Sequence, residues 1–203
     1  ARFEFPAQVE HAIELAQKLR DDEFPELSKL LSEFTQKVNF KPADTVEDWG
    51  IYLELFIGIR ETLDKFVPDV FDRPLTELIA ATAPRKGVDK SERSVMSGAN
   101  RRRLKKLAKE YLRPGMHTSD MHASLVAIQH QREQWKSFCE LATAPQVPLG
   151  IADAQIAYRA FVADLEVLQG HLDAESDEPA LFRLPLNLLK AKLSSLAEHS
   201  DAL

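Results

Sequence analysis

The chain has 203 residues, of which 44% are hydrophobic and 29% charged, enough for a packed core in one large or two small domains. Its single cysteine, Cys139, excludes an internal disulfide framework and favours a reducing compartment, so we expect a cytoplasmic protein. The longest apolar run, residues 51–59, is interrupted by Glu54 and is too short to span a bilayer, so no membrane partner is expected. The first residue is Ala1 rather than Met, which indicates processing or excision from a longer protein.

Positive charge is concentrated in one segment of an acidic chain. The net charge is −6, yet the segment from Arg85 to Arg113 holds 11 Lys and Arg against three acids, a net of +8. The remainder holds 15 Lys and Arg against 29 acids, a net of −14. Such a protein is not a general polyanion binder, and any contact with nucleic acid is expected in the basic segment.

Apolar residues recur at helical spacing in the first part of the chain, and no window shows the alternation of a strand. Pro6 suits the first turn of a helix, and Phe24-Pro25 marks either a break or a restart. The second helix is expected to end at Lys41-Pro42, since a residue before proline disfavours helix. The apolar positions of these helices are Val9, Ala12, Ile13, Ala16, Leu19, Leu27, Leu30, Leu31, Phe34 and Val38.

A capping signal opens the third helix. Thr45 followed by Asp48 has the spacing of a capping box, and Pro68 ends the helix that follows. Its inward positions are Trp49, Leu53, Phe56, Leu63 and Phe66. Asp72 is then expected to cap a short helix over residues 74–83, which Pro84 closes.

The middle of the chain is expected to alternate polar connections with two helices. Residues 85–98 are polar and contain two glycines, which predicts a loop. A basic helix follows over residues 100–112, and Ser119 is expected to cap another over residues 120–141. Residues 144–148 contain two prolines and predict a linker.

The clearest periodicity lies near the C-terminus, where apolar residues alternate spacings of three and four. This seam consists of Ile151, Ala154, Tyr158, Phe161, Leu165, Leu168 and Leu172. It predicts a long helix packed at a shallow angle on a partner, followed by an acidic loop (173–178) and a last helix (185–198). The expected fold is all-α, a helical bundle with a long antiparallel coiled-coil-like hairpin. Its expected parts are 1–83, a loop at 84–99, and 100–203, or one continuous domain.

Motifs for nucleotide binding are absent from the sequence. Residues 87–91 resemble the tail of a P-loop, but no glycine directly precedes Lys90. The seven glycines never fall two apart, so the Gly-x-Gly dinucleotide fingerprint is also missing. We therefore expect no catalytic residue and no ATP or Mg²⁺ site in this chain.

Candidate metal ligands and nucleophiles also have simpler interpretations. The spacing of His117, His122 and His130 does not place three ligands on one side of a single turn, so exposed or capping histidines are expected. Cys139 lies beside an apolar stripe, where a structural thiol is favoured over a nucleophile. Three carboxylates share part of one helix, Glu54, Glu61 and Asp64, and solvated side chains explain them.

The basic helix is the one feature that suggests a ligand. Its apolar residues, Leu104, Leu107, Ala108 and Tyr111, fall within about 100° of a helical wheel. The remaining arc contains the cations Arg101, Arg102, Arg103, Lys105, Lys106, Lys109 and Arg113. Mutual repulsion among them is a cost that stability alone does not explain. Three interpretations stay open: a solvated face paired with acids, a phosphate-binding face for nucleic acid, and a face for an anionic membrane or acidic protein. Few bulky apolar residues are available for insertion into lipid.

Three stretches around this helix resemble a known family. They are VFDRPLTELIAATA (70–83), RRRLKKLAKEYLRPG (101–115) and DMHASLVAIQHQREQW (120–135). Together they resemble an accessory helical segment of large actinobacterial superfamily I DNA/RNA helicases, over roughly residues 70–172. The resemblance implies that ATP and Mg²⁺ bind other parts of a longer parent chain. It also implies DNA and the motor domains of that chain as partners.

These observations predict a non-catalytic accessory domain of a DNA helicase, with the seven cations contacting phosphates without sequence readout. The alternative is a protein-interaction scaffold without nucleic acid, in which the heptad seam or the acidic faces bind a partner. Salt-sensitive DNA binding favours the first prediction, and association that survives charge reversal favours the second.

Overall fold

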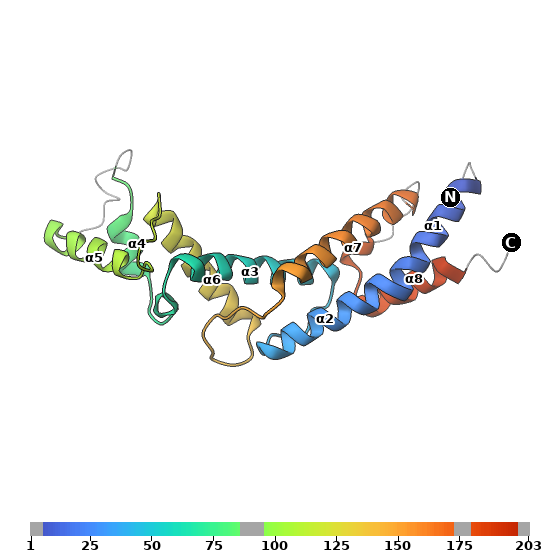
Figure 1. The fold of residues 1–203 in the computed structure, drawn as a ribbon, viewed down its shortest axis with the longest axis horizontal. Helices are drawn as coiled ribbons and strands as arrows, with labels where there is room; N and C mark the ends of the chain where they lie inside the picture. The colour runs from blue at the N-terminus through green and yellow to red at the C-terminus, as the bar shows by residue number, and fades with distance from the viewer. Residues whose placement is uncertain (1–5, 86–95, 173–179, 199–203) are drawn as a thin grey trace. The chain divides into compact units, whose positions relative to one another are not determined.

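The computed structural model describes residues 6–85, 96–172 and 180–198, and its named elements in those ranges are all helical (Figure 1). The predicted all-α class is therefore confirmed. The α-helices are α1 (Pro6–Lys18), α2 (Phe24–Lys37), α3 (Val46–Lys65), α4 (Thr76–Thr82), α5 (Gly98–Glu110), α6 (Met121–Phe138), α7 (Ile151–Leu172) and α8 (Leu186–Glu198). The segment η1 (Leu19–Glu23) is a π-helix, and η2 (Pro68–Phe71) and η3 (Leu181–Arg183) are 3₁₀ turns.

The chain forms two compact units. Unit 1 comprises Ala1–Glu54 and Pro148–Leu203, and unit 2 comprises Leu55–Val147. One boundary between the units lies inside α3 and the other lies at residues 147–148, within the predicted linker. Unit 1 is therefore assembled from both ends of the chain, which local composition does not reveal.

The first two helices are joined without a break. Pro25 stands at the start of α2 and has no N–H to donate, so the regular hydrogen-bond ladder cannot pass through it unchanged. The chain widens into the π-helical turn η1, in which the Phe24 N–H donates to the Leu19 carbonyl. Both Leu19 and Phe24 are buried, so the widened turn keeps the apolar side of both helices on the core. The sequence predicts a break or a restart at Phe24-Pro25, whereas the structure shows a continuous helical path through η1.

The end of α2 is set by Asn39 rather than by Pro42. Asn39 has φ of 58°, a left-handed conformation that asparagine tolerates better than most residues. The Phe40 N–H donates to the Thr35 carbonyl at 2.9 Å and the Asn39 N–H to Gln36 at 3.2 Å, which is a Schellman ending.

The predicted capping box at α3 is confirmed. The Asp48 N–H donates to Thr45 Oγ1 at 3.1 Å, and Asp48 Oδ2 accepts from the backbone N–H groups of Thr45 (3.1 Å) and Asp44 (3.0 Å). Backbone donors at this helix start therefore have side-chain partners.

Replacing Thr45 with alanine should lower the free energy of unfolding by about 1 kcal/mol, because a helix donor loses its acceptor. Urea denaturation followed by circular dichroism measures the change. Thr76→Ala is the control, since Thr76 is exposed at the start of α4. Equal effects of the two substitutions would show that the Thr45 hydroxyl does not stabilise the helix.

The core of unit 1 contains an aromatic cluster under α7. Phe161 lies 6.1 Å from Phe24 and 6.4 Å from Trp49 between ring centroids, and Phe24 lies 5.9 Å from Trp49. The other buried seam positions are Ile151, Ala154, Leu165 and Leu168. Tyr158 of the seam is half-buried and donates its hydroxyl to the Val46 carbonyl at 3.1 Å. Burial, reinforced by nearby Glu47 and Glu166, raises the pKa of Tyr158 to about 12.

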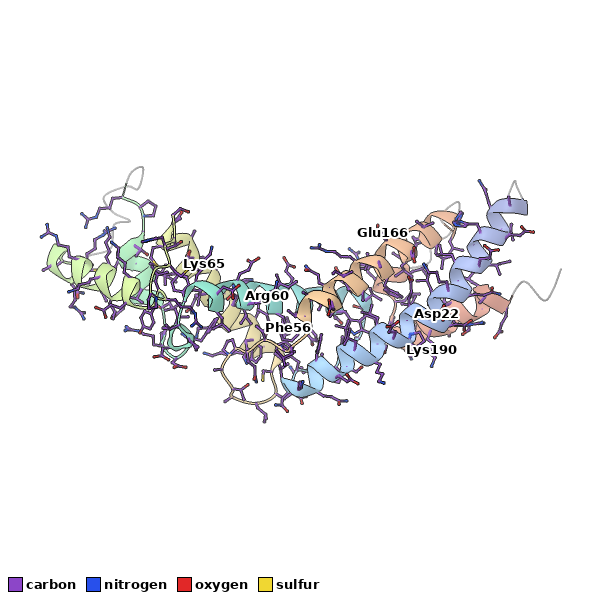
Figure 2. All side chains as sticks on the ribbon, viewed as in Figure 1. Asp22, Phe56, Arg60, Lys65, Glu166 and Lys190 are labelled. Carbon is purple, nitrogen blue, oxygen red and sulfur yellow. The ribbon has the colours of Figure 1, made fainter. Side chains whose placement is uncertain are left out.

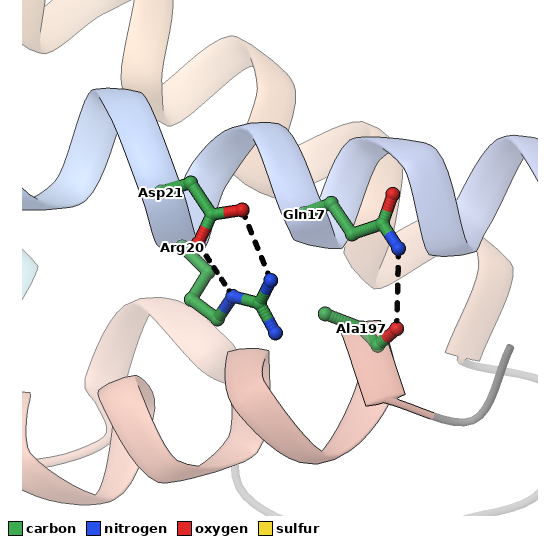
Figure 3. Close-up of polar contacts among 4 residues, drawn as sticks. All are labelled: Gln17, Arg20, Asp21 and Ala197. Atoms are coloured by element: carbon green, nitrogen blue, oxygen red, sulfur yellow. Dashed lines mark hydrogen bonds and ion pairs between the residues drawn. The ribbon is translucent and has the colours of Figure 1, made fainter. Parts of the chain in front are cut away.

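The helices around α1 pair segments that are distant in sequence. Lys18 of α1 binds Asp164 of α7 at 3.0 Å. Gln17 of α1 donates to the Ala197 carbonyl of α8 at 3.4 Å (Figure 3). The adjacent Arg20–Asp21 pair, bonded at 2.7 and 2.9 Å, lies beside α8 in the same view (Figure 3). Thus α7 and α8 both pack on α1. The predicted long antiparallel coiled-coil-like hairpin is not confirmed.

Unit 2 is built from the second half of α3 together with η2, α4, α5 and α6. Phe56 of α3, labelled in Figure 2, lies edge-on to Trp135 of α6 with ring centroids 6.4 Å apart. Helix α4 packs on both α5 and α6 and buries Leu78 and Ala81. Thr62 of α3 donates to Gln131 of α6 at 2.9 Å, a polar contact beside this core.

Two predicted caps in unit 2 are wrong. The N-cap of α4 is Leu75 without a side-chain bond, because the helix begins only at Thr76 and Asp72 instead follows the η2 turn as its C-cap. Asp120, not Ser119, caps α6, since Asp120 is the residue whose Oδ1 accepts from the Ala123 N–H at 2.9 Å.

The predicted acidic loop at 173–178 lies outside the described residues. No helix in the described ranges combines the length and apolar character that a bilayer span requires.

Candidate nucleic-acid interface

The basic helix α5 begins at a side-chain cap that was not predicted. Ser97 has extended backbone and its Oγ accepts from the Asn100 N–H at 3.2 Å. The helix therefore starts at Gly98, two residues before the predicted start, and ends at Glu110. Most of the predicted loop before it, residues 86–95, lies outside the described residues.

One side of α5 fixes the helix to α4. Leu104 and Ala108 are buried, and Leu107 and Tyr111 are half-buried. Arg101 belongs to this side as well, because its Nη2 donates to the Ala83 carbonyl at 2.6 Å, just after the end of α4. Partial burial and the neighbouring positive charge of Arg85 lower the pKa of Arg101. Arg101 thus acts as an anchor between helices.

The opposite side of α5 presents four exposed cations: Arg102, Lys105, Lys106 and Lys109. At 100° per residue they fall within an arc of about 100°, whose centre lies about 160° from the mean direction of Leu104, Leu107, Ala108 and Tyr111. In the described parts of the chain none of the four forms an ion pair, although the acids of the chain outnumber its bases. We call these four side chains the cationic face of α5.

The two remaining predicted residues are placed differently. Arg103 donates from Nε and Nη2 to Asn100 Oδ1 at 3.2 and 2.8 Å, one turn back on the same helix. Arg113 lies beyond the helix end, where its N–H donates to the Lys65 carbonyl at 2.8 Å and its Nε to the Leu63 carbonyl at 2.6 Å. Arg113 therefore neutralises the C-terminal end of α3, where backbone carbonyls lack helical partners.

This Arg113 contact continues a short extended pairing between α3 and the end of α5. The Val67 N–H donates to the Tyr111 carbonyl at 2.8 Å, and Phe66 pairs with Leu112 in an antiparallel bridge. A helical wheel gives no signal for such tertiary bonds. The structure thus brings together four of the seven predicted cations and assigns intramolecular contacts to Arg101, Arg103 and Arg113.

The histidines and the cysteine of unit 2 are placed by helix packing. His122 Nδ1 lies 3.1 Å from the Ile79 carbonyl and 3.4 Å from Thr82 Oγ1, so this side chain joins α6 to α4. His117 and His130 are exposed, and Cys139 Sγ lies 3.4 Å from Thr143 Oγ1. Within residues 6–85, 96–172 and 180–198, no group of three or more His, Cys, Asp or Glu is positioned to hold a metal ion.

The two units carry net charges of opposite sign. Unit 2 contains 16 Lys and Arg against 11 Asp and Glu, a net of +5. Unit 1 contains 10 Lys and Arg against 21 Asp and Glu, a net of −11. The cationic face can attract phosphates over a distance of about one Debye length, roughly 8 Å at physiological salt. An anionic ligand is therefore expected to approach unit 2.

No protein-family model, curated protein or solved structure matches this chain.

Proposed function

We propose that this chain is a non-catalytic accessory domain of a DNA helicase that binds the DNA backbone through the cationic face of α5. In this proposal the chain works in the cytoplasm, beside motor domains of the same parent protein that bind ATP and Mg²⁺. The helicase assignment rests on the sequence resemblance over residues 70–172. The DNA contact rests on the four cations.

The observation that supports DNA binding most directly is the pattern of exposure on α5. Buried Leu104 and Ala108 hold the opposite side on the protein, and Arg102, Lys105, Lys106 and Lys109 are left in solvent. Flexible cations on one face supply affinity for phosphates, whereas base recognition needs side chains such as Asn or Gln placed against base edges. The expected binding is therefore electrostatic and independent of base sequence.

The test is a fluorescence-anisotropy titration of labelled duplex and single-stranded DNA at several salt concentrations. If each of the four cations contacts one phosphate, the slope of log K against log salt should be about −3.6 for duplex DNA. Two unrelated sequences of equal length should bind equally at each salt concentration. Absence of binding at low salt, or a slope near zero, would contradict the proposal.

A second candidate function is a protein-interaction scaffold, and the outer side of α7 favours it. Three large apolar residues are exposed there and just before it, with Leu149 at 88%, Ile156 at 67% and Val167 at 47% exposed. Sedimentation analysis over a range of protein concentrations distinguishes the candidates. Self-association that Ile156→Glu abolishes and charge reversal on α5 leaves intact would favour the scaffold.

A further inference from the structure

Two histidines from distant parts of the chain meet in unit 1, where α1 lies beside α7. His11 Nδ1 of α1 lies 3.1 Å from His171 Nε2 of α7, with ring centroids 5.3 Å apart and ring planes at 75°. Both side chains reach solvent, His11 being exposed and His171 half-buried. The pair is separate from the cationic face of α5, which belongs to unit 2.

The helix packing holds this pair in a defined register. Lys18 binds Asp164 at 3.0 Å. Lys18 follows His11 by seven residues, whereas Asp164 precedes His171 by seven residues. The helices α1 and α7 are therefore antiparallel here, and the two contacts are spaced by one heptad on each helix. Ala12 and Leu168 are buried beside the pair, so both backbones are fixed by the core.

Stability alone gives little reason for this arrangement. A hydrogen bond between two neutral, solvent-accessible imidazoles replaces bonds to water and adds about 0.5–1.5 kcal/mol at most. Two positively charged imidazole rings at this distance would repel each other. Neither ring is buried, so the pair also contributes little hydrophobic stabilisation. The feature that distinguishes the pair is the approach of two imidazole nitrogens, each able to ligate a metal ion, from two helices that the core holds in place.

We propose that His11 and His171 together chelate a divalent transition-metal ion of the class that imidazole prefers: Cu(II), Ni(II) or Zn(II). Metal–imidazole bonds are about 2.0–2.1 Å long, so two such nitrogens at right or tetrahedral angles lie roughly 2.9–3.4 Å apart. The observed 3.1 Å falls inside that interval. In the hydrogen bond one of the two facing nitrogens carries a proton, so metal binding requires that ring to carry its single proton on its other nitrogen instead. Both facing nitrogens then offer a lone pair, and a turn about the Cβ–Cγ bond directs each of them to the ion.

The surroundings define what kind of site this is. Solvent access leaves the remaining coordination positions to water, so the site is open rather than a closed structural centre. Hard cations such as Mg²⁺ prefer oxygen ligands and are not expected to bind two imidazoles. Among the three metals, Cu(II) should bind most tightly, following the general order of affinity for nitrogen ligands. A bound ion would tie α1 to α7 and stabilise unit 1.

The test is calorimetric titration of the untagged full chain with CuCl₂, and in parallel with MgCl₂. His11→Gln and His171→Gln are compared with His130→Gln, which removes an exposed histidine of α6 and keeps the histidine count equal. We expect one equivalent of Cu(II) to bind the parent and His130→Gln. That step should be lost in both His11→Gln and His171→Gln, and Mg²⁺ should give no heat of binding.

Two further measurements distinguish loss of the metal site from loss of folding. The melting temperature of the parent should rise with added Cu(II) and fall back to its metal-free value with EDTA. In the presence of Cu(II), His11→Gln and His171→Gln should melt at the temperature of the metal-free parent. Electron paramagnetic resonance of the one-to-one complex should show nitrogen coupling that either substitution removes. Unchanged Cu(II) binding in His11→Gln and His171→Gln, loss in only one of them, or no binding step in the parent would each overturn the proposal.

Discussion

Replacement of Phe161 by alanine is expected to lower the free energy of unfolding by about 3–5 kcal/mol. Phe161 is 1% exposed and contacts both Phe24 and Trp49, so its removal leaves a cavity among three elements of unit 1. Those elements come from both ends of the chain and cannot close the cavity without shifting the helices. Leu165→Ala, one turn further along the same side of α7, should cost about 2–5 kcal/mol for the same reason.

Urea unfolding followed by tryptophan fluorescence and circular dichroism measures this loss. Trp49 reports on unit 1 and Trp135 on unit 2, so the substitution should shift the transition of unit 1. Ile156→Ala is the matched control, because Ile156 lies on the same helix with 67% of its surface exposed, and its effect should stay within about 0.5 kcal/mol. If Phe161→Ala and Ile156→Ala unfold alike, the described packing of α7 is wrong.

Charge reversal of the cationic face should abolish DNA binding while the fold stays intact. The variant replaces Arg102, Lys105, Lys106 and Lys109 by glutamate, which turns attraction to phosphates into repulsion. Without the four cations, few counterions are released on binding, and both the affinity and its salt dependence should disappear. The melting temperature should change little, because all four side chains are exposed and the anchoring residues of α5 are untouched.

A control with the same change in net charge separates a local effect from a global one. Four exposed lysines of unit 1, Lys29, Lys37, Lys41 and Lys190, are replaced by glutamate instead. If the cationic face is the site, this control keeps most of the DNA affinity of the parent. Equal loss of DNA affinity in both variants would mean that only net charge matters. Retained DNA binding in the α5 variant would show that the cationic face is not the DNA-binding site.

Local sequence patterns predict the structure correctly where neighbouring residues determine it. The Thr45–Asp48 spacing identifies a capping box because donor and acceptor lie within one turn of each other. The alternating spacing over residues 151–172 likewise indicates a single helix, and five of its seven seam residues are buried. The opposite faces of α5 follow from the same periodicity.

Features that depend on distant contacts were not predictable in this way. Arg101 and Arg113 have the same charge as their neighbours, and only the positions of Ala83 and Leu63 make them intramolecular donors. Asp72 and Ser119 have good capping chemistry, yet a 3₁₀ turn and a stronger neighbouring cap, Asp120, displace them. The meeting of His11 with His171 requires the register between α1 and α7, which periodicity alone does not give.

The path of the chain through unit 1 has a consequence for its synthesis. Ala16 and Leu19 belong to the first part of unit 1, whereas α7 and α8, which pack around them, follow the whole of unit 2. During translation the apolar side of α1 therefore lacks α7 and α8, its packing partners, while residues 55–147 emerge from the ribosome. Unit 2 is continuous in sequence and can fold during that interval. Helices α7 and α8 then complete unit 1, so unit 1 becomes stable only after α8 has been synthesised.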